Sequence, residues 1–314
     1  MKYGVLAYSN SINMGDEVQS VAARRLLPKV DYYIDRSGID KKVTDEEIRL
    51  ICNGWFTGTP KNWPPAENIK PLFISFHITD SNRSRKLLPS SKLKDYYSRF
   101  GPVGCRDLKT LELFRSNGID AYFSGDLTLT LENRFTERND EILLVDPLRY
   151  NYTKAYRDYI VNNLVPAKYR DAVRVINQRR TEINISNEQR FADAEWLIEQ
   201  YSKAKLVITS RIHCALPCLA LGTPVYFINA GYHSTLLNLN DRFEGILEMF
   251  TSFGEEYFPY ATGSIYHRLL RGAGSYRKKA VKPLPIDWDN PEPNSYDFSN
   301  LKAGMKQRVE DFLK

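Results

Sequence analysis

Cysteine is scarce in this sequence. Four of the 314 residues are cysteines, and no two of them form a C-x-x-C pair. Because pairs at that spacing are typical of redox motifs and zinc sites, the sequence argues against both. The four lie in apolar stretches, at Cys52, Cys105, Cys214 and Cys218. We therefore expect small buried hydrophobic residues in a reducing compartment.

Long apolar runs are absent as well. No stretch approaches the roughly 20 residues that a transmembrane helix needs. The first eight residues have too little apolar character for a signal peptide. A cytoplasmic protein is the resulting expectation.

The composition is otherwise that of a globular protein, with 42% hydrophobic and 26% charged residues. A length of 314 residues predicts two domains rather than one. The net charge of +6 suits an anionic substrate or an anionic membrane surface as well as it suits nucleic acid.

The most informative stretch for predicting the fold and the site is 206–228. Its pattern predicts a buried strand at 206–209, a helix at 214–221 and a second strand at 225–228. The polar turn before the helix consists of Ser210, Arg211, Ile212 and His213. In parallel α/β sheets, ligands bind at the carboxyl ends of strands, beside helix N-termini. The turn therefore predicts an anion site, although an arginine that caps the sheet and a histidine packed in the core would give the same pattern.

A second polar turn follows the first predicted strand, at 3–7. It contains Asn13, Gly15 and Asp16, and we predict a helix over 17–27 with Asp16 as its N-cap. The turn is placed to contact a ligand. Taken alone, it is explained better as an ordinary connection between a strand and a helix.

Strands and helices alternate along the chain, which predicts parallel sheets. The alternation pauses in the polar stretch 128–140, where we place a domain boundary. We assign 1–130 to an N-terminal α/β domain, 141–250 to a C-terminal α/β domain, and 251–314 to an irregular basic and tyrosine-rich tail that ends in a helix. The predicted fold is α/β, with two Rossmann-like parallel-sheet domains that face a cleft in a GT-B-like arrangement.

The tail carries a basic cluster composed of Arg268, Arg271, Arg277, Lys278 and Lys279. Such a cluster could lie over the cleft or against an anionic membrane surface. A solvated loop explains it equally well.

Three motifs together resemble the polysaccharide pyruvyl transferase family. The first is Asn13-Met14-Gly15-Asp16-Glu17, similar to the family's N-x-G-D-E turn. The second is Gly104-Cys105-Arg106-Asp107, with Gly125-Asp126 after the next strand. The third and most specific is Ser210-Arg211-Ile212-His213, followed by the segment 219–225. The resemblance runs from residue 1 to about 245. It departs at Cys52-Asn53-Gly54-Trp55, where many members have a glycine-rich triplet.

The resemblance implies a GT-B-like fold and the transfer of pyruvate from phosphoenolpyruvate to a sugar of a bacterial surface polysaccharide or its lipid-linked precursor. The product would be a cyclic ketal. The N-terminal domain would hold the acceptor and the C-terminal domain the donor. The residues implied in substrate binding are Asn13, Gly15, Arg106, Ser210, Arg211 and Ile212. A lipid-linked acceptor would bring the basic tail to the inner face of the membrane.

The implied chemistry suits these residues. Phosphoenolpyruvate carries a carboxylate and a phosphate, and the planar fork of Arg106 or Arg211 can bind either group with two hydrogen bonds. His213 is the expected general acid. Asp16 or Asp126 is the expected base toward the sugar hydroxyl, and either could equally be a helix cap. Phosphoenolpyruvate is a co-substrate, and no cofactor or metal is required because two arginines and a helix N-terminus supply positive charge.

Other functions fit parts of the pattern. A GT-B glycosyltransferase with a nucleotide-sugar donor would need a glycine-rich diphosphate turn, and the turn 210–213 has no glycine. A non-catalytic polysaccharide-assembly protein would need none of Arg106, Arg211 and His213. A nucleic-acid binder fits least, because the basic tail lacks a recognisable module.

Overall fold

In the computed structural model, the N-terminal half of the chain forms a sheet of six parallel strands in the order β2-β1-β3-β4-β5-β6. The strands are β1 (Lys2–Ala7), β2 (Tyr32–Asp35), β3 (Ile48–Trp55), β4 (Ile69–His77), β5 (Val103–Cys105) and β6 (Ala121–Phe123). Their residues are buried on both faces through most of β1 and β3. Continuous burial of this kind is typical of a parallel sheet covered by helices.

The helices of this half are α1 (Met14–Leu26), α2 (Ser91–Phe100) and α3 (Leu108–Ser116), with 3-10 turns η1 (Arg36–Gly38) and η3 (Leu127–Thr130). The prediction that Asp16 caps the first helix is wrong. The helix begins three residues earlier than expected, and Asn13 is its N-cap, accepting a hydrogen bond from the Gly15 backbone N–H. Asp16 instead lies in the first turn, where the positive end of the helix dipole favours a carboxylate.

The second half forms a sheet of five parallel strands in the order β13-β10-β9-β7-β8. The strands are β7 (Ile142–Val145), β8 (Val173–Ile176), β9 (Leu206–Thr209), β10 (Val225–Ile228) and β13 (Thr251–Phe253). The helical segments are α5 (Asn187–Lys203), α6 (Ile212–Ala220), η4 (Ala167–Ala172), η5 (Asp241–Phe243) and η6 (Leu247–Met249). Short strands β11 (His233–Ser234) and β12 (Leu237–Asn238) pair antiparallel. The predicted strand–helix–strand unit at 206–228 is confirmed.

The structure describes residues 1–56, 61–81, 87, 91–147, 158, 161–229, 233–234, 237–238, 241–254, 257 and 283–314. The basic cluster of the tail lies outside the described residues.

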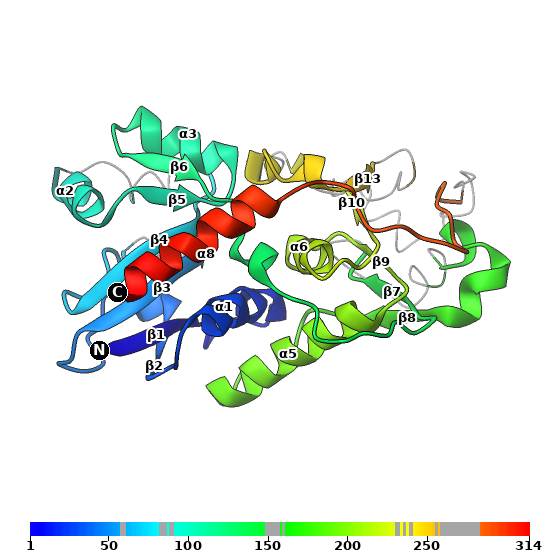
Figure 1. Cartoon of the computed structure of the whole chain (residues 1–314), viewed down its shortest axis with the longest axis horizontal. Helices are drawn as coiled ribbons and strands as arrows, with labels where there is room; N and C mark the ends of the chain where they lie inside the picture. Colours follow the sequence, from blue (N-terminus) through cyan, green and yellow to red (C-terminus); the bar gives the residue numbers. More distant parts are fainter. Residues whose placement is uncertain are drawn as a thin grey trace.

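The last helix, α8 (Ser299–Leu313), packs on the first sheet rather than the second (Figure 1). Met305 is buried and lies beside Ser75 of β4, and the Arg308 guanidinium lies 3.8 Å from the centre of the Tyr122 ring of β6. The chain therefore begins and ends in the same domain. The predicted division at 130, 141 and 250 stays a prediction, with the refinement that β13 adds residues 251–253 to the second sheet.

The two domains are joined by a buried interface. Helix α1 of the first packs against α5 and α6 of the second, and one hydrophobic core contains residues of both sheets and of α8. Glu17 of α1 is fully buried there and contacts Arg190 at 3.1 Å and Arg180 at 3.4 Å. Two parallel-sheet α/β domains packed in this way confirm the predicted fold class. Among the described residues, no helix is long and apolar enough to span a membrane.

Candidate functional site

A cavity of about 110 Å³ lies where loops from the carboxyl ends of strands of both domains meet. Such ends are the usual ligand sites of parallel sheets. The lining residues come from the loop after β1, the loop after β8, the turn between β9 and α6, and η5. They are Asn13, Gln178, Ser210, Arg211, Ile212, His213, Arg242 and Phe243. The structure thus brings five of the predicted site residues together: Asn13 and the whole turn 210–213.

Arg211 is held in one orientation by its neighbours. It is the N-cap of α6, and its backbone N–H donates to Thr209 Oγ1 at 2.9 Å. Its Nε donates to Asp146 Oδ2, also at 2.9 Å. Its two terminal nitrogens have no protein partner among the described residues, and the side chain is 19% exposed. The guanidinium therefore presents a fixed pair of donors to the cavity, as two-point recognition of a carboxylate or phosphate requires.

Asp146, which orients Arg211, directly follows strand β7. Its backbone has a φ of 38°, a strained value for a residue other than glycine. The conformation is fixed from two sides, because Ser210 Oγ donates to the Asp146 carbonyl at 2.7 Å and the Gln178 N–H donates to Oδ2 at 3.1 Å. Ser210 therefore contributes to the site by holding the backbone of Asp146, which in turn orients Arg211.

His213 lies at a break in α6 that Pro217 explains. Proline has no N–H, so the carbonyl four residues earlier in the helix, that of His213, has no helical donor. The backbone of His213 leaves helical geometry, with φ −83° and ψ 21°. Gln178 Nε2 supplies the missing hydrogen bond at 3.0 Å and also donates to the Tyr201 hydroxyl at 2.8 Å. Pro217 thus leaves the His213 carbonyl free to accept from Gln178, in the loop after β8, and this hydrogen bond holds the His213 backbone in place.

The imidazole of His213 faces a buried carboxylate from the first domain. Its Nε2 lies 3.5 Å from Asp126 Oδ2, while Asp126 Oδ1 accepts hydrogen bonds from the backbone N–H and hydroxyl of Thr128. Burial disfavours the charged carboxylate, but the hydrogen bonding and charge of His213, together with Arg106, outweigh it and lower the pKa of Asp126 to about 2. Asp126 is therefore placed to position His213 rather than to reach a sugar hydroxyl, because its carboxylate is buried against the imidazole.

We expect acid to weaken the fold through this group. A folded-state pKa of about 2, against 3.8 ordinarily, stabilises the native state above pH 4. The contribution, about 2 kcal/mol, is lost as the pH falls from about 4 to about 2. Urea unfolding at pH 5 and pH 3 should show a smaller loss of stability in Asp126→Asn than in the wild-type protein. An equal loss in both would contradict the assignment.

The three predicted residues of the first turn differ in their position relative to the cavity. Asn13 lines the cavity, and its Nδ2 donates to Asp16 Oδ1 at 2.9 Å. Gly15 lies against the histidine: a Cβ at this position would be 3.2 Å from His213 Cβ. Asp16 does not line the cavity, and it also accepts from Ser11 Oγ at 2.6 Å. Asp16 is thus placed to orient Asn13, and its predicted role as a base has no contact in this structure to support it.

Arg106 is fully buried and does not line the cavity. Its Nη2 lies 3.4 Å from Asp107 Oδ2 and donates to the carbonyl of Arg242, which does line it. Its Nε and Nη1 are buried without a hydrogen-bond partner. Two unpaired donors on a buried cation cost free energy of folding, so we interpret them as donors that a bound acceptor would satisfy. The expectation that Arg106 contacts the substrate stays a prediction.

Sequence reasoning missed Asp146, which orients Arg211, and three residues that line the cavity, Gln178, Arg242 and Phe243. Asp146 and Gln178 follow strands β7 and β8, so polar residues at strand ends were the available signal. Arg242 lies in η5, inside a stretch without a clear motif. Together with Arg211 and the N-terminus of α6, it brings positive charge to the cavity, which suits an anion. Among the described residues, no group of three or more potential ligands could hold a metal ion.

Comparison with known proteins gives one strong match. The family model of polysaccharide pyruvyl transferases matches residues 13–232, which include the whole turn 210–213 and both Asn13 and Arg106. No curated protein matches the sequence.

The matches among solved structures are distant. A functionally uncharacterised protein of Klebsiella pneumoniae is 17% identical, with a TM-score of 0.41, covering 78% of this chain and 88% of that one. The E. coli heptosyltransferase WaaC with ADP-2-deoxy-2-fluoro heptose is 13% identical, with a TM-score of 0.25 and coverages of 73% and 88%. The same enzyme with ADP is 11% identical, with a TM-score of 0.24, covering 73% of this chain and 87% of that one. At TM-scores below 0.5, these likenesses locate no residue.

Proposed function

The chain belongs to the polysaccharide pyruvyl transferase family, and we propose that it transfers pyruvate from phosphoenolpyruvate to two hydroxyls of a sugar, forming a cyclic ketal. The observation that carries the proposal is that Arg211 and His213 line one small cavity, with Arg211 hydrogen-bonded to Asp146 and His213 3.5 Å from the carboxylate of Asp126. This reaction needs at least a cation that binds the anionic donor and an imidazole that can move a proton beside it.

The size of the cavity favours a compact donor. Its volume of about 110 Å³ is below the roughly 300–1,000 Å³ of typical small-molecule pockets. Phosphoenolpyruvate is small and carries two anionic groups, whereas a nucleotide sugar needs room for a base, a ribose and a diphosphate. Arg211 would bind one anionic group of phosphoenolpyruvate with its two terminal nitrogens, and Arg242 lines the same cavity.

The proton balance gives His213 its role. One sugar hydroxyl attacks C2 of phosphoenolpyruvate as the methylene carbon gains a proton and becomes a methyl group. The second hydroxyl then displaces phosphate by attacking the same carbon. Two hydroxyl protons leave the sugar, one in effect ending on the methyl group and one on phosphate. Because Nε2 of His213 faces Asp126, the other ring nitrogen is the one available to move a proton at the substrate.

The partners follow from this reaction. The acceptor is a glycan of a polysaccharide or of its lipid-linked precursor, and phosphoenolpyruvate is a co-substrate, so we propose no further cofactor. A lipid-linked acceptor would place the protein at the inner face of the membrane, with the basic tail as the contact. Arg106 would bind the phosphate or carboxylate after a shift that frees its two unpaired donors.

Phosphate release tests the proposal. Incubation with phosphoenolpyruvate and a deacetylated polysaccharide panel should release inorganic phosphate only when an acceptor is present. The glycan should gain a methyl signal in its proton NMR spectrum. Release without any acceptor, or a modified glycan without pyruvate, would contradict ketal transfer.

A further inference from the structure

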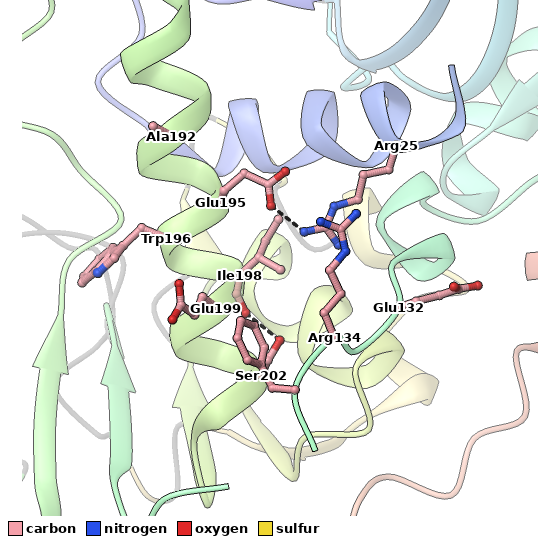
Figure 2. A pocket seen from close by; sticks show the side chains of 10 residues that line it. Arg25, Glu132, Arg134, Ala192, Glu195, Trp196, Ile198, Glu199 and Ser202 are labelled. Carbon is pink, nitrogen blue, oxygen red and sulfur yellow. Dashed lines mark hydrogen bonds and ion pairs between the residues drawn. The ribbon is translucent and has the colours of Figure 1, made fainter. Parts of the chain in front are cut away.

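A second, larger cavity of about 390 Å³ lies at the junction of the domains. Its walls come from the C-terminal end of α1, the segment between η3 and β7, and the outer face of α5. The lining includes Arg25, Arg134, Phe135, Glu195, Trp196 and Glu199. Figure 2 shows the side chains of Arg25 and Arg134 extending into it from different elements.

The charges in this cavity do not cancel. Each carboxylate already has a cationic partner. Glu195 binds Arg24 at 2.7 Å and Arg25 at 2.5 Å, Glu199 binds Lys203 at 2.5 Å, and Glu132 binds Lys306 at 2.6 Å. Arg134 is exposed and has no ion pair or hydrogen bond among the described residues. The cavity therefore has an unpaired guanidinium at Arg134, next to Arg25, whose Nε is buried without a hydrogen-bond partner. The exposed guanidinium of Arg134 is the donor open to an acidic group.

Trp196 connects this cavity with a third. Its side chain is 45% exposed, and it lines both the junction cavity and one of about 380 Å³ that includes Met14 and Arg179. Met14 adjoins Asn13 of the small donor cavity, and Arg179 pairs with Asn13 in an isolated β-bridge. Three cavities thus follow one another along the seam of α1 and α5. From Met14 to Arg25 the helix rises about 17 Å.

We propose that the acceptor glycan lies along this path, stacked on Trp196, with an acidic group bound by Arg134 in the junction cavity. An exposed indole offers the flat apolar surface on which the C–H face of a sugar ring packs. A ligand long enough to span the path is a polymer rather than a single sugar. The inference rests on the proposed function, whose product itself carries a carboxylate on a sugar, so repeating units already modified would have the required charge.

Binding measurements without turnover test this subsite. We would titrate the full chain calorimetrically with trigalacturonate, maltotriose and inorganic phosphate, using the wild type, Arg134→Ala and Trp196→Ala. Because Arg134 and Trp196 are exposed, neither change should disturb the fold. Arg99→Ala is the matched control, since it removes an exposed guanidinium from α2, on the far side of the first sheet.

We expect trigalacturonate to bind more tightly than maltotriose. Arg134→Ala should weaken trigalacturonate binding about tenfold, the effect of one charged hydrogen bond, while Arg99→Ala should leave it unchanged. Trp196→Ala should weaken both sugars. If only phosphate shows a dependence on Arg134, the acidic group is a phosphate of the glycan. Affinities that do not depend on Arg134 for either anion, or no binding by the wild type, would overturn the subsite. Titration of phosphoenolpyruvate into the same proteins keeps the two proposals separate, because its binding depends on Arg211 and not on Arg134.

Discussion

Arg211→Lys is expected to lower kcat/KM for phosphoenolpyruvate by about 10²-fold or more, although the positive charge is kept. In the wild-type protein, Nε is committed to Asp146, and the terminal pair of nitrogens is left for the ligand. A lysine has one nitrogen, which cannot both bind Asp146 and supply a fork to the substrate. The loss of one charge-assisted two-point contact corresponds to about 2.7 kcal/mol.

The control for this variant is Arg99→Lys. Arg99 is exposed, lies in α2 and does not line the donor cavity. It should keep kcat/KM for phosphoenolpyruvate within a few-fold of wild type. Steady-state phosphate release measures both variants, with thermal unfolding to confirm that each is folded. Wild-type kinetics in Arg211→Lys would remove this guanidinium from the reaction.

His213→Gln should have the second large effect, a fall in kcat of about 10²–10⁴-fold. The affinity for phosphoenolpyruvate should change only a few-fold, since glutamine cannot transfer a proton near neutral pH but fills much of the same space. The separation of kcat from binding is the important readout. Calorimetry of phosphoenolpyruvate binding and single-turnover phosphate release measure the two quantities independently.

An opposite result is equally informative. If His213→Gln lost phosphoenolpyruvate binding but retained most of its turnover at saturation, the imidazole would be an anion contact and not a proton donor. Asp126→Asn should also lower kcat, but less than the histidine variant does, because the asparagine can keep a contact to Nε2 of His213 while it removes the negative charge beside the ring.

The fold was predictable where local patterns dominate. The run at 206–209 and the Gly222 and Pro224 stop signals determine the β9–α6–β10 unit almost residue by residue. The error at Asp16 shows the limit of such reasoning. Both Asn13 and Asp16 are good N-cap residues, and the choice between them depends on a hydrogen bond from the Met14 N–H to the carbonyl of Gln178, in the other domain.

Part of the cavity lining was predictable from the sequence, and the residues that orient this lining were not. The turn 210–213 is visible in the sequence because three polar residues, Ser210, Arg211 and His213, interrupt an apolar unit. Asp146 and Gln178, which orient that turn, are 65 and 35 residues away from their partners Arg211 and His213. No local periodicity encodes such pairs. The burial of Arg106 is likewise set by the packing of α3 against η5.

Phosphoenolpyruvate binding tests the central claim most directly. A thermal-shift screen would compare phosphoenolpyruvate with a panel of nucleotide sugars, using the wild type and Arg211→Lys. At about 100 times its Kd, a ligand stabilises the folded protein by about 2.7 kcal/mol. We expect phosphoenolpyruvate to stabilise the wild type and to lose most of that effect in Arg211→Lys, with no response to the nucleotide sugars. Stabilisation by a nucleotide sugar in place of phosphoenolpyruvate would contradict pyruvyl transfer and indicate a glycosyltransferase.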